Sequence, residues 1–178
     1  QSYKMRVRSL RFLLNSKILF FRKIYFFYNI YLRNFKYLKG GSQFDEDLYL
    51  NSFFDKNYIG KFVDLGCFHP TRDNNTFRFY KKNWTGINVD LNPITIELFN
   101  FKRPKDINIC AALSNKIKRA NLYYHHDLSS QNTLSDNHVS WMKKNFGLNK
   151  LKTKTIKTNR LDKILKKFDI KHIDFLNI

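Results

Sequence analysis

The hydrophobic and polar positions from residue 42 onward alternate between short apolar runs and segments with helical spacing. The apolar runs, several of which end in a glycine or an acid, predict strands at 62–66, 86–90, 107–113, 122–126, 152–158 and 173–178. The segments with helical spacing predict helices at about 43–55, 76–82, 92–101 and 161–168. Strands that alternate with helices in this way predict an α/β fold with a Rossmann-like, doubly wound and mainly parallel sheet.

Two of these helices begin with recognisable capping residues. Ser42 stands three residues before Asp45, so its hydroxyl and the acid have the spacing of a helix start. Asn92 and Pro93 supply a side-chain cap and a first-turn proline. Because the Asn92 side chain is expected to cap the helix, the neighbouring carboxylate of Asp90 is left free for a ligand.

The first 39 residues have a different pattern, in which cations interrupt clusters of aromatic and aliphatic side chains. This segment holds ten Lys and Arg residues and no acid, whereas residues 40–178 hold 23 Lys and Arg residues and 14 acids. We therefore place a boundary near Gly40 and Gly41, between a basic, aromatic helical segment at 1–39 and a domain at 42–178. The segment is expected to form one or two amphipathic helices, which either make peripheral contact with an anionic membrane or pack on their own domain.

Composition and cysteine content narrow the class of protein. A chain of 178 residues with 43% hydrophobic residues and a net charge of +19 fits a globular domain rather than a disordered tail. The longest uncharged stretch near the N-terminus, 24–32, is far shorter than the roughly 20 residues that a spanning helix needs. Cys67 and Cys110 lie at the ends of the first and third strands, between which the second is expected to lie, so we expect no bond between them. This favours a reducing, cytoplasmic setting, with membrane association through 1–39 left open.

The candidate chemistry lies beyond the carboxyl ends of the strands, where sheets of this type bind ligands. Asp64 and Gly66 end the first strand, and Asp90 ends the second, 24 residues after Gly66. An acid at about this distance from the glycine turn is placed to accept hydrogen bonds from both hydroxyls of a ribose. The turn has one glycine where a dinucleotide site has three, which argues against a bound pyrophosphate. A nucleoside with a cationic sulfonium fits better, because Asp64 can attract its charge, and that ligand is S-adenosylmethionine.

An ordered set of segments carries a resemblance to a known family. The segments are Phe62-Val-Asp-Leu-Gly-Cys-Phe-His-Pro70, Asn75-Thr76, Asn83-Trp-Thr-Gly-Ile-Asn-Val-Asp-Leu-Asn-Pro93, Leu161-Asp162 and the closing 173–178. In this order they resemble the FkbM family of S-adenosylmethionine-dependent methyltransferases, over about residues 42–178. The resemblance implies a class I Rossmann-like enzyme that methylates hydroxyl groups, often on sugars of bacterial glycans or on secondary metabolites.

The sequence also departs from the family pattern. Asp45 stands where family members usually have a glycine. The family continues after its counterpart of 173–178 with an acidic motif and further strands, whereas this sequence stops at Ile178. We therefore expect 42–178 to be the N-terminal two-thirds of a methyltransferase domain, with poor activity as a fragment.

The candidate site residues come from the ends of the three strands and from the loop after the first. The expected cofactor-binding residues are Asp64, Gly66, Cys67, Phe68, Asn75, Thr76, Asp90, Leu91, Asn92, Ala111 and Ala112, of which the two alanines resemble the family's adenine-side segment. His69 is the candidate catalytic base, and Asp73 is a second candidate that can orient the acceptor hydroxyl. Each has a structural alternative: His69 can brace its loop, Asp73, Asn75 and Thr76 can cap a helix, and the alanines can be plain packing.

Two other chemistries receive less support from the sequence. His125, His126 and Asp127 invite a metal site, but neighbouring side chains of an extended segment point to opposite faces, so we expect no metal there. The basic run 150–157 and the net charge suggest the alternative of a binding module for nucleic acid or an anionic membrane surface. Alternating Lys and Thr also suit the solvated face of a strand, and no nucleic-acid motif accompanies them, so nucleic acid is the less favoured partner.

Overall fold

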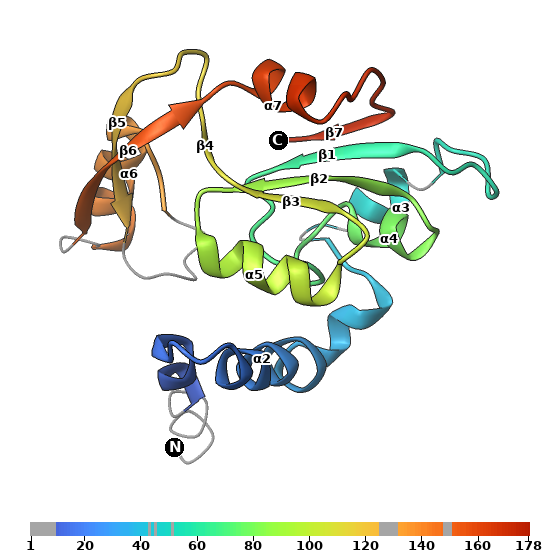
Figure 1. The fold of residues 1–178 in the computed structure, drawn as a ribbon, viewed down its shortest axis with the longest axis horizontal. Helices are drawn as coiled ribbons and strands as arrows, with labels where there is room; N and C mark the ends of the chain where they lie inside the picture. Colours follow the sequence, from blue (N-terminus) through green and yellow to red (C-terminus); the bar gives the residue numbers. More distant parts are fainter. Residues whose placement is uncertain (1–9, 43, 45, 51, 125–131, 148–150) are drawn as a thin grey trace.

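A computed structural model describes residues 10–178 apart from 43, 45, 51, 125–131 and 148–150, and Figure 1 shows its ribbon. The strands are β1 (Lys61–Leu65), β2 (Thr85–Asp90), β3 (Ile107–Cys110), β4 (Ala112–Leu113), β5 (Arg119–Tyr124), β6 (Lys152–Asn159) and β7 (Phe175–Asn177). The helices of the domain are α3 (Glu46–Leu50), α4 (Phe77–Lys81), α5 (Pro93–Lys102), α6 (Asp136–Phe146) and α7 (Leu161–Lys167). Before them come η1 (Leu10–Asn15), α2 (Leu19–Phe27), the π-helix η2 (Tyr28–Arg33) and η3 (Phe35–Lys39).

The main sheet has four parallel strands in the order β3-β2-β1-β7. Val63 of β1 pairs in register with Ile87 of β2 and Leu176 of β7. Helix α5 covers one face of this sheet and α7 the other, as Figure 1 shows. On the α7 side, Val63 and Ile87 pack with Ile164 in a buried apolar cluster. The arrangement confirms the predicted α/β fold with a mainly parallel sheet.

A second, three-stranded sheet in the order β4-β6-β5 corrects the predicted strand at 107–113. The chain leaves the main sheet after β3, where the Ala111 N–H donates to the carbonyl of Asp90 at 2.9 Å. The next two residues form β4, which pairs in parallel with the end of β6. Strands β5 and β6 match the predicted strands at 122–126 and 152–158 as far as the described residues extend, but they pair antiparallel and outside the main sheet.

An aromatic cluster closes the amino end of the sheet. Phe62, Phe79 and Trp84 are buried there, and Phe54 meets Trp84 edge-to-face with ring centroids 4.8 Å apart. Because Phe54 turns back into this cluster, the described helix α3 ends at Leu50 and is shorter than the predicted segment 43–55.

Gly86 of β2 lies directly against Phe62, its partner in β1. A Cβ atom at Gly86 would come within 2.3 Å of the Phe62 carbonyl oxygen and of its ring. We therefore expect Gly86→Ala to lower the free energy of unfolding by about 1–3 kcal/mol, because backbone must move to relieve the overlap. Urea denaturation checks this, with Thr85→Ala on the exposed neighbouring position as the control; equal midpoints for both variants would contradict it.

Helix α6 has no counterpart among the predicted elements. Only Val139 and Met142 are buried, and the apolar residues Trp141 and Phe146 are exposed, so the apolar periodicity is weak. Its ends carry the missing signals: the Ser135 side chain accepts a hydrogen bond from the His138 N–H, and Gly147 follows in the left-handed conformation.

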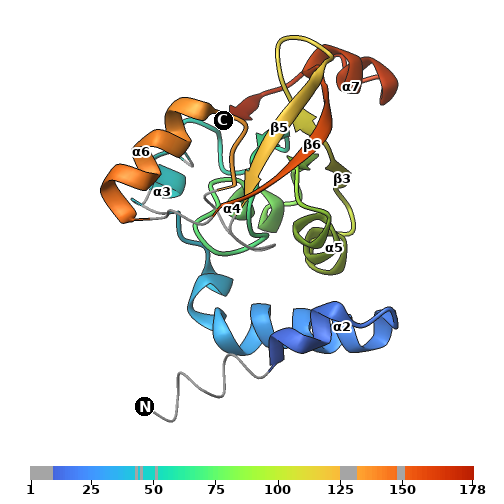
Figure 2. The ribbon, with the colours of Figure 1, turned by 90° about the vertical axis from the view of Figure 1, so that its left-hand side faces the viewer.

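The N-terminal helices form a layer beneath α5, as Figures 1 and 2 show from two directions. Helix α2 runs directly into η2. Tyr25 and Phe26 of α2 and Ile30 of η2 are buried with Leu98 of α5. The predicted helical segment therefore packs on its own domain through one face. In the described part of the chain, no helix has the length and apolar character required to cross a membrane.

Candidate active site

A cavity of about 330 Å³ opens at the carboxyl ends of β1, β2 and β3. This volume falls in the range of roughly 300–1,000 Å³ that is typical of small-molecule sites. The described residues that line it are Leu65, Gly66, Phe68, Val89, Asp90, Leu91, Thr95, Ala111, Ala112, Leu113, Asn132, Leu134 and Ile178. Its position is therefore the one at which open α/β sheets bind ligands.

Asp90 is the one titratable residue among these described lining residues. Its Oδ2 accepts a hydrogen bond from the Phe68 N–H at 3.1 Å, and its Oδ1 accepts one from the Asn92 N–H at 2.8 Å. A carboxylate has about four acceptor positions, so each oxygen retains one for a ligand. Burial raises the pKa of Asp90, while the two backbone hydrogen bonds oppose that shift.

The turn after β1 brings backbone close to the cavity without a side chain in front of it. Gly66 has a φ of +71°, and a Cβ atom added there would meet nothing within 4 Å. Phe68 also has a positive φ, of 53°, and its N–H points to Asp90. The two backbone hydrogen bonds thereby fix the carboxylate between the β1 turn and the start of α5.

Six of the predicted cofactor-binding residues line this cavity: Gly66, Phe68, Asp90, Leu91, Ala111 and Ala112. The structure thus brings together the ends of β1 and β2 with the crossover from β3 to β4. Their role as cofactor ligands stays a prediction. The remaining five predicted residues lie around the cavity rather than on it.

Asp64 is fully buried, and its carboxylate is hydrogen-bonded to other side chains of the protein. Its Oδ2 accepts hydrogen bonds from Thr76 Oγ1 at 2.8 Å and Asn74 Nδ2 at 3.0 Å, and its Oδ1 accepts one from Asn177 Nδ2 at 2.8 Å. Asn75 donates to Asn177 Oδ1 at 2.9 Å. These side chains tie β1 and β7 to the loop and do not line the cavity. Thr76 stands at the N-cap of α4 but makes no side-chain capping hydrogen bond, so the predicted capping role is not what the structure shows for it. A role of Asp64, Asn75 and Thr76 in cofactor binding stays a prediction.

Two other predicted cofactor-binding residues, Cys67 and Asn92, pack against α5 and cap it, respectively. Cys67 is buried against Ile96 and Phe99 of α5, and burial raises the pKa of its thiol well above the ordinary value. Both it and Cys110 are free thiols, since β2 separates the strands that carry them. Asn92 caps α5 as predicted, with its side-chain oxygen accepting from the Ile94 N–H at 3.0 Å.

His69 braces its loop and is a poor candidate for the catalytic base. Its Nδ1 accepts hydrogen bonds from the N–H groups of Thr71 and Arg72, so Nε2 carries the proton and donates to Asn29 Oδ1 at 2.8 Å. The ring is 5% exposed and lies outside the lining of the cavity. Burial, together with the charges of Arg72 and Arg33, lowers the pKa of His69 to about 3, so the ring is neutral at neutral pH and is too weak a base to take up a second proton there.

Asp73, the second catalytic candidate, is exposed and lies outside the cavity lining. Its carboxylate is 3.4 Å from Arg72 Nε. Its φ of +49° marks a turn residue, and aspartate tolerates that conformation better than most residues. The structure therefore gives Asp73 a place in the loop but no contact with the candidate site.

Sequence reasoning missed two groups of residues. Thr95 lines the cavity from the first turn of α5, three residues after the Asn92 cap, a spacing that could have indicated it. Arg103 and Asp106 form a fully buried ion pair, with Nε 2.8 Å from Oδ2. Arg103 Nη1 also donates to Thr76 Oγ1 at 3.0 Å, which links the pair to Asp64. No local signal in the sequence indicates this pair.

A metal site finds no support among the described residues, where no three His, Cys, Asp or Glu side chains are grouped to hold an ion. His125, His126 and Asp127, at which we expect no metal from the sequence, lie outside the described residues.

The parallel sheet in this order, with an acid at the end of β2 facing a cavity, defines a Rossmann-like α/β protein whose cavity lies where such sheets bind small molecules. The family model of the methyltransferase FkbM domain matches residues 57–178. The chain therefore belongs to the FkbM methyltransferase family, as the sequence resemblance predicted, and is a methyltransferase. Comparison with curated proteins and with solved structures gave no match.

Proposed function

We propose that the chain uses S-adenosylmethionine to methylate a hydroxyl group, on a sugar or glycan. The observation that carries this proposal is the Asp90 carboxylate at the end of β2, held toward a cavity by two backbone hydrogen bonds. FkbM methyltransferases generally depend on this cofactor, and the family resemblance supports a hydroxyl acceptor.

The residues around the cavity suit the parts of an adenosyl ligand. Each oxygen of Asp90 has room for one hydroxyl of a ribose. Ala111, Ala112 and Leu134 offer small apolar surface on which an adenine ring can pack, and the open space at Gly66 lets a ligand approach backbone. When bound, the cofactor supplies an electrophilic methyl group on a positively charged sulfur.

Positioning is the contribution that these residues can make to catalysis. Apart from Asp90, the described lining residues are polar without a titrating group or are apolar, so they supply no general base. The part that these residues can take in the reaction is to hold donor and acceptor in line and to exclude water, which can account for a large share of a rate enhancement. His69 and Asp64 support this indirectly, by fixing the loop that follows β1.

Replacement of Asp90 by asparagine tests the proposal. We expect Asp90→Asn to weaken binding of S-adenosylmethionine by roughly 30- to 100-fold, because the amide has one oxygen and no charge with which to accept two ribose hydroxyls. S-adenosylhomocysteine has the same ribose and should lose affinity by a similar factor. Isothermal titration calorimetry measures both.

Asp55→Asn is the matched control, since Asp55 is an exposed loop residue outside the cavity lining. It should leave both affinities unchanged. Thermal unfolding of each variant verifies that the loop around Asp90 remains folded. Unchanged affinity in Asp90→Asn, or wild-type protein that binds neither ligand, would refute the proposed cofactor site.

A further inference from the structure

Helix α2 and its continuation η2 have apolar side chains on two opposite faces. Tyr25, Phe26 and Ile30 point into the cluster under α5. On the other side, Phe20, Ile24 and Phe27 follow at helical spacing and are 65%, 41% and 52% exposed. A helix that is apolar on both faces is normally buried on both, and within the described part of the chain the outer face lacks such a partner.

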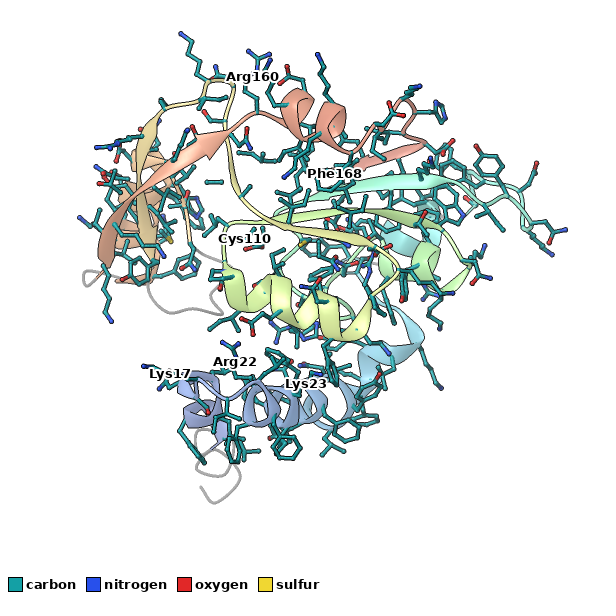
Figure 3. The ribbon with its side chains drawn as sticks, viewed as in Figure 1. Lys17, Arg22, Lys23, Cys110, Arg160 and Phe168 are labelled. Carbon is teal, nitrogen blue, oxygen red and sulfur yellow. The ribbon has the colours of Figure 1, made fainter. Side chains whose placement is uncertain are left out.

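The exposed apolar surface extends over the whole N-terminal layer. Its large apolar residues, each at least 39% exposed, are Phe12, Ile18, Leu19, Phe20, Phe21, Ile24, Phe27, Leu32 and Phe35. In Figure 3, ring side chains project from the side of α2 that faces away from α5. A concentration of this size within one short segment marks an interaction surface rather than the scattered apolar residues of an ordinary exterior.

Cations surround this surface, and acids do not. Lys17, Lys23, Arg33, Lys36 and Lys39 are exposed in the same layer, and residues 1–39 contain no Asp or Glu. Figure 3 shows Arg22 on the side toward α5, where its Nη1 lies 3.3 Å from Glu97 Oε1. Among the described ion pairs, Arg22 is the one cation of this layer that is joined to an acid, and that acid belongs to α5.

We propose that the outer face of the N-terminal layer docks on an anionic membrane surface. Phenylalanine and leucine side chains would enter the boundary between headgroups and acyl chains, while the flanking lysines contact lipid phosphates. Interfacial helices have this combination of aromatic and aliphatic residues with Lys and Arg. The docked helix lies along the membrane and does not cross it.

Charge distinguishes this partner from a second copy of the chain. Two copies joined through this face would bring the five exposed cations of each described layer together, and residues 1–39 supply no acid to balance them. An anionic bilayer balances such exposed charges, and each lysine near its surface contributes roughly a fivefold gain in affinity. The charge pattern therefore complements a lipid surface and opposes self-association.

Docking would also place the candidate active site in a defined relation to the membrane. Asn29 lies on the inner face of the same helix and accepts a hydrogen bond from His69, in the loop that carries Phe68 to the cavity. The helix is thus tied to the loop at the cavity. A membrane-bound acceptor would be consistent with this arrangement, but the docking surface does not depend on the proposed cofactor.

Flotation of the full chain with lipid vesicles tests the proposal. Vesicles of phosphatidylcholine with 30% phosphatidylglycerol should bind the wild-type chain, and pure phosphatidylcholine vesicles should bind it far less. The triple variant Phe20→Ser, Ile24→Ser, Phe27→Ser should lose at least tenfold in partitioning to anionic vesicles. A matched triple, Ile117→Ser, Trp141→Ser, Phe146→Ser, removes exposed apolar residues elsewhere and should bind like wild type.

A charge series completes the test. Lys17→Gln, Lys23→Gln, Lys36→Gln together should weaken binding roughly 100-fold, whereas Lys143→Gln, Lys144→Gln, Lys163→Gln, which are exposed in α6 and α7, should have little effect. No flotation of the wild-type chain, or equal binding to neutral and anionic vesicles, would overturn the proposal. It would also be overturned if sedimentation analysis found a stable dimer that the Phe20, Ile24, Phe27 triple variant converts to a monomer.

Discussion

Replacement of Asp106 by asparagine should lower the free energy of unfolding by roughly 3–5 kcal/mol, the cost of leaving a buried cation without its partner. Arg103 is 0% exposed, and its Nε lies 2.8 Å from Asp106 Oδ2. Asp106 also accepts hydrogen bonds from the Gly86 N–H and from Asn88 Nδ2. An asparagine retains one of the two acceptor oxygens and directs an amide donor at groups that are themselves donors. Burial raises the pKa of Asp106, against the influence of Arg103.

An exposed pair on the same chain provides the control. Arg160 Nε is also 2.8 Å from a carboxylate oxygen of Asp162, but these side chains are 47% and 54% exposed. Because water screens such a pair, Asp162→Asn should cost less than about 1 kcal/mol. Urea denaturation of both variants measures the difference. Similar losses in the two variants would show that burial of the Arg103–Asp106 pair has no special energetic role.

A double variant separates the lost attraction from the stranded charge. Arg103→Met combined with Asp106→Asn removes the cation, so it should be more stable than Asp106→Asn alone although it lacks both ions. A double-mutant cycle on the two positions gives the coupling energy. If the double variant were the less stable of the two, the guanidinium would stabilise the core mainly through its contacts with Phe62, Tyr80 and Phe99, whose ring centroids lie 5.0–5.2 Å away.

The elements that could be predicted from the sequence are those whose cause is local. Asn92 and Pro93 begin α5 because a side-chain cap and a first-turn proline act within a few residues. Asp90 could be placed on the cavity because the end of a buried strand and its distance from Gly66 are both visible in the sequence. The four parallel strands follow from apolar runs of the correct length.

The roles that could not be predicted depend on partners far away in the sequence. His69 is engaged by Asn29, 40 residues earlier, and Asp64 by Asn177, 113 residues later. Their positions in the loop and at the strand end are also those of a base and a ligand, so the sequence alone leaves both interpretations open. Likewise, the apolar run 107–113 does not reveal that β3 ends at Cys110, because that break depends on where β6 lies.

The wild-type chain should lose stability as the pH falls below about 6.5, and His69 should be a main cause. The ordinary pKa of histidine, 6.5, applies to the unfolded chain, whereas the pKa of His69 in the folded chain is about 3. Between pH 6.5 and 3, His69 therefore binds a proton in the unfolded state but not in the folded state. The stability contributed by His69 is fully present above pH 6.5 and is lost progressively as the pH falls toward 3.

The size of this effect follows from the separation of the two pKa values. At pH 5 the loss should be about 2 kcal/mol relative to pH 7.5, and it should grow to roughly 4 kcal/mol by pH 3. His69→Gln loses the hydrogen bonds of the buried ring, so its free energy of unfolding should be lower than that of the wild type at pH 7.5. Because glutamine cannot take up a proton, that free energy should change less between pH 7.5 and 5. The difference between the two slopes in urea denaturation isolates His69 from all other titrating groups. A slope in His69→Gln that equals the wild-type slope would mean that burial and the charges of Arg72 and Arg33 do not keep His69 neutral.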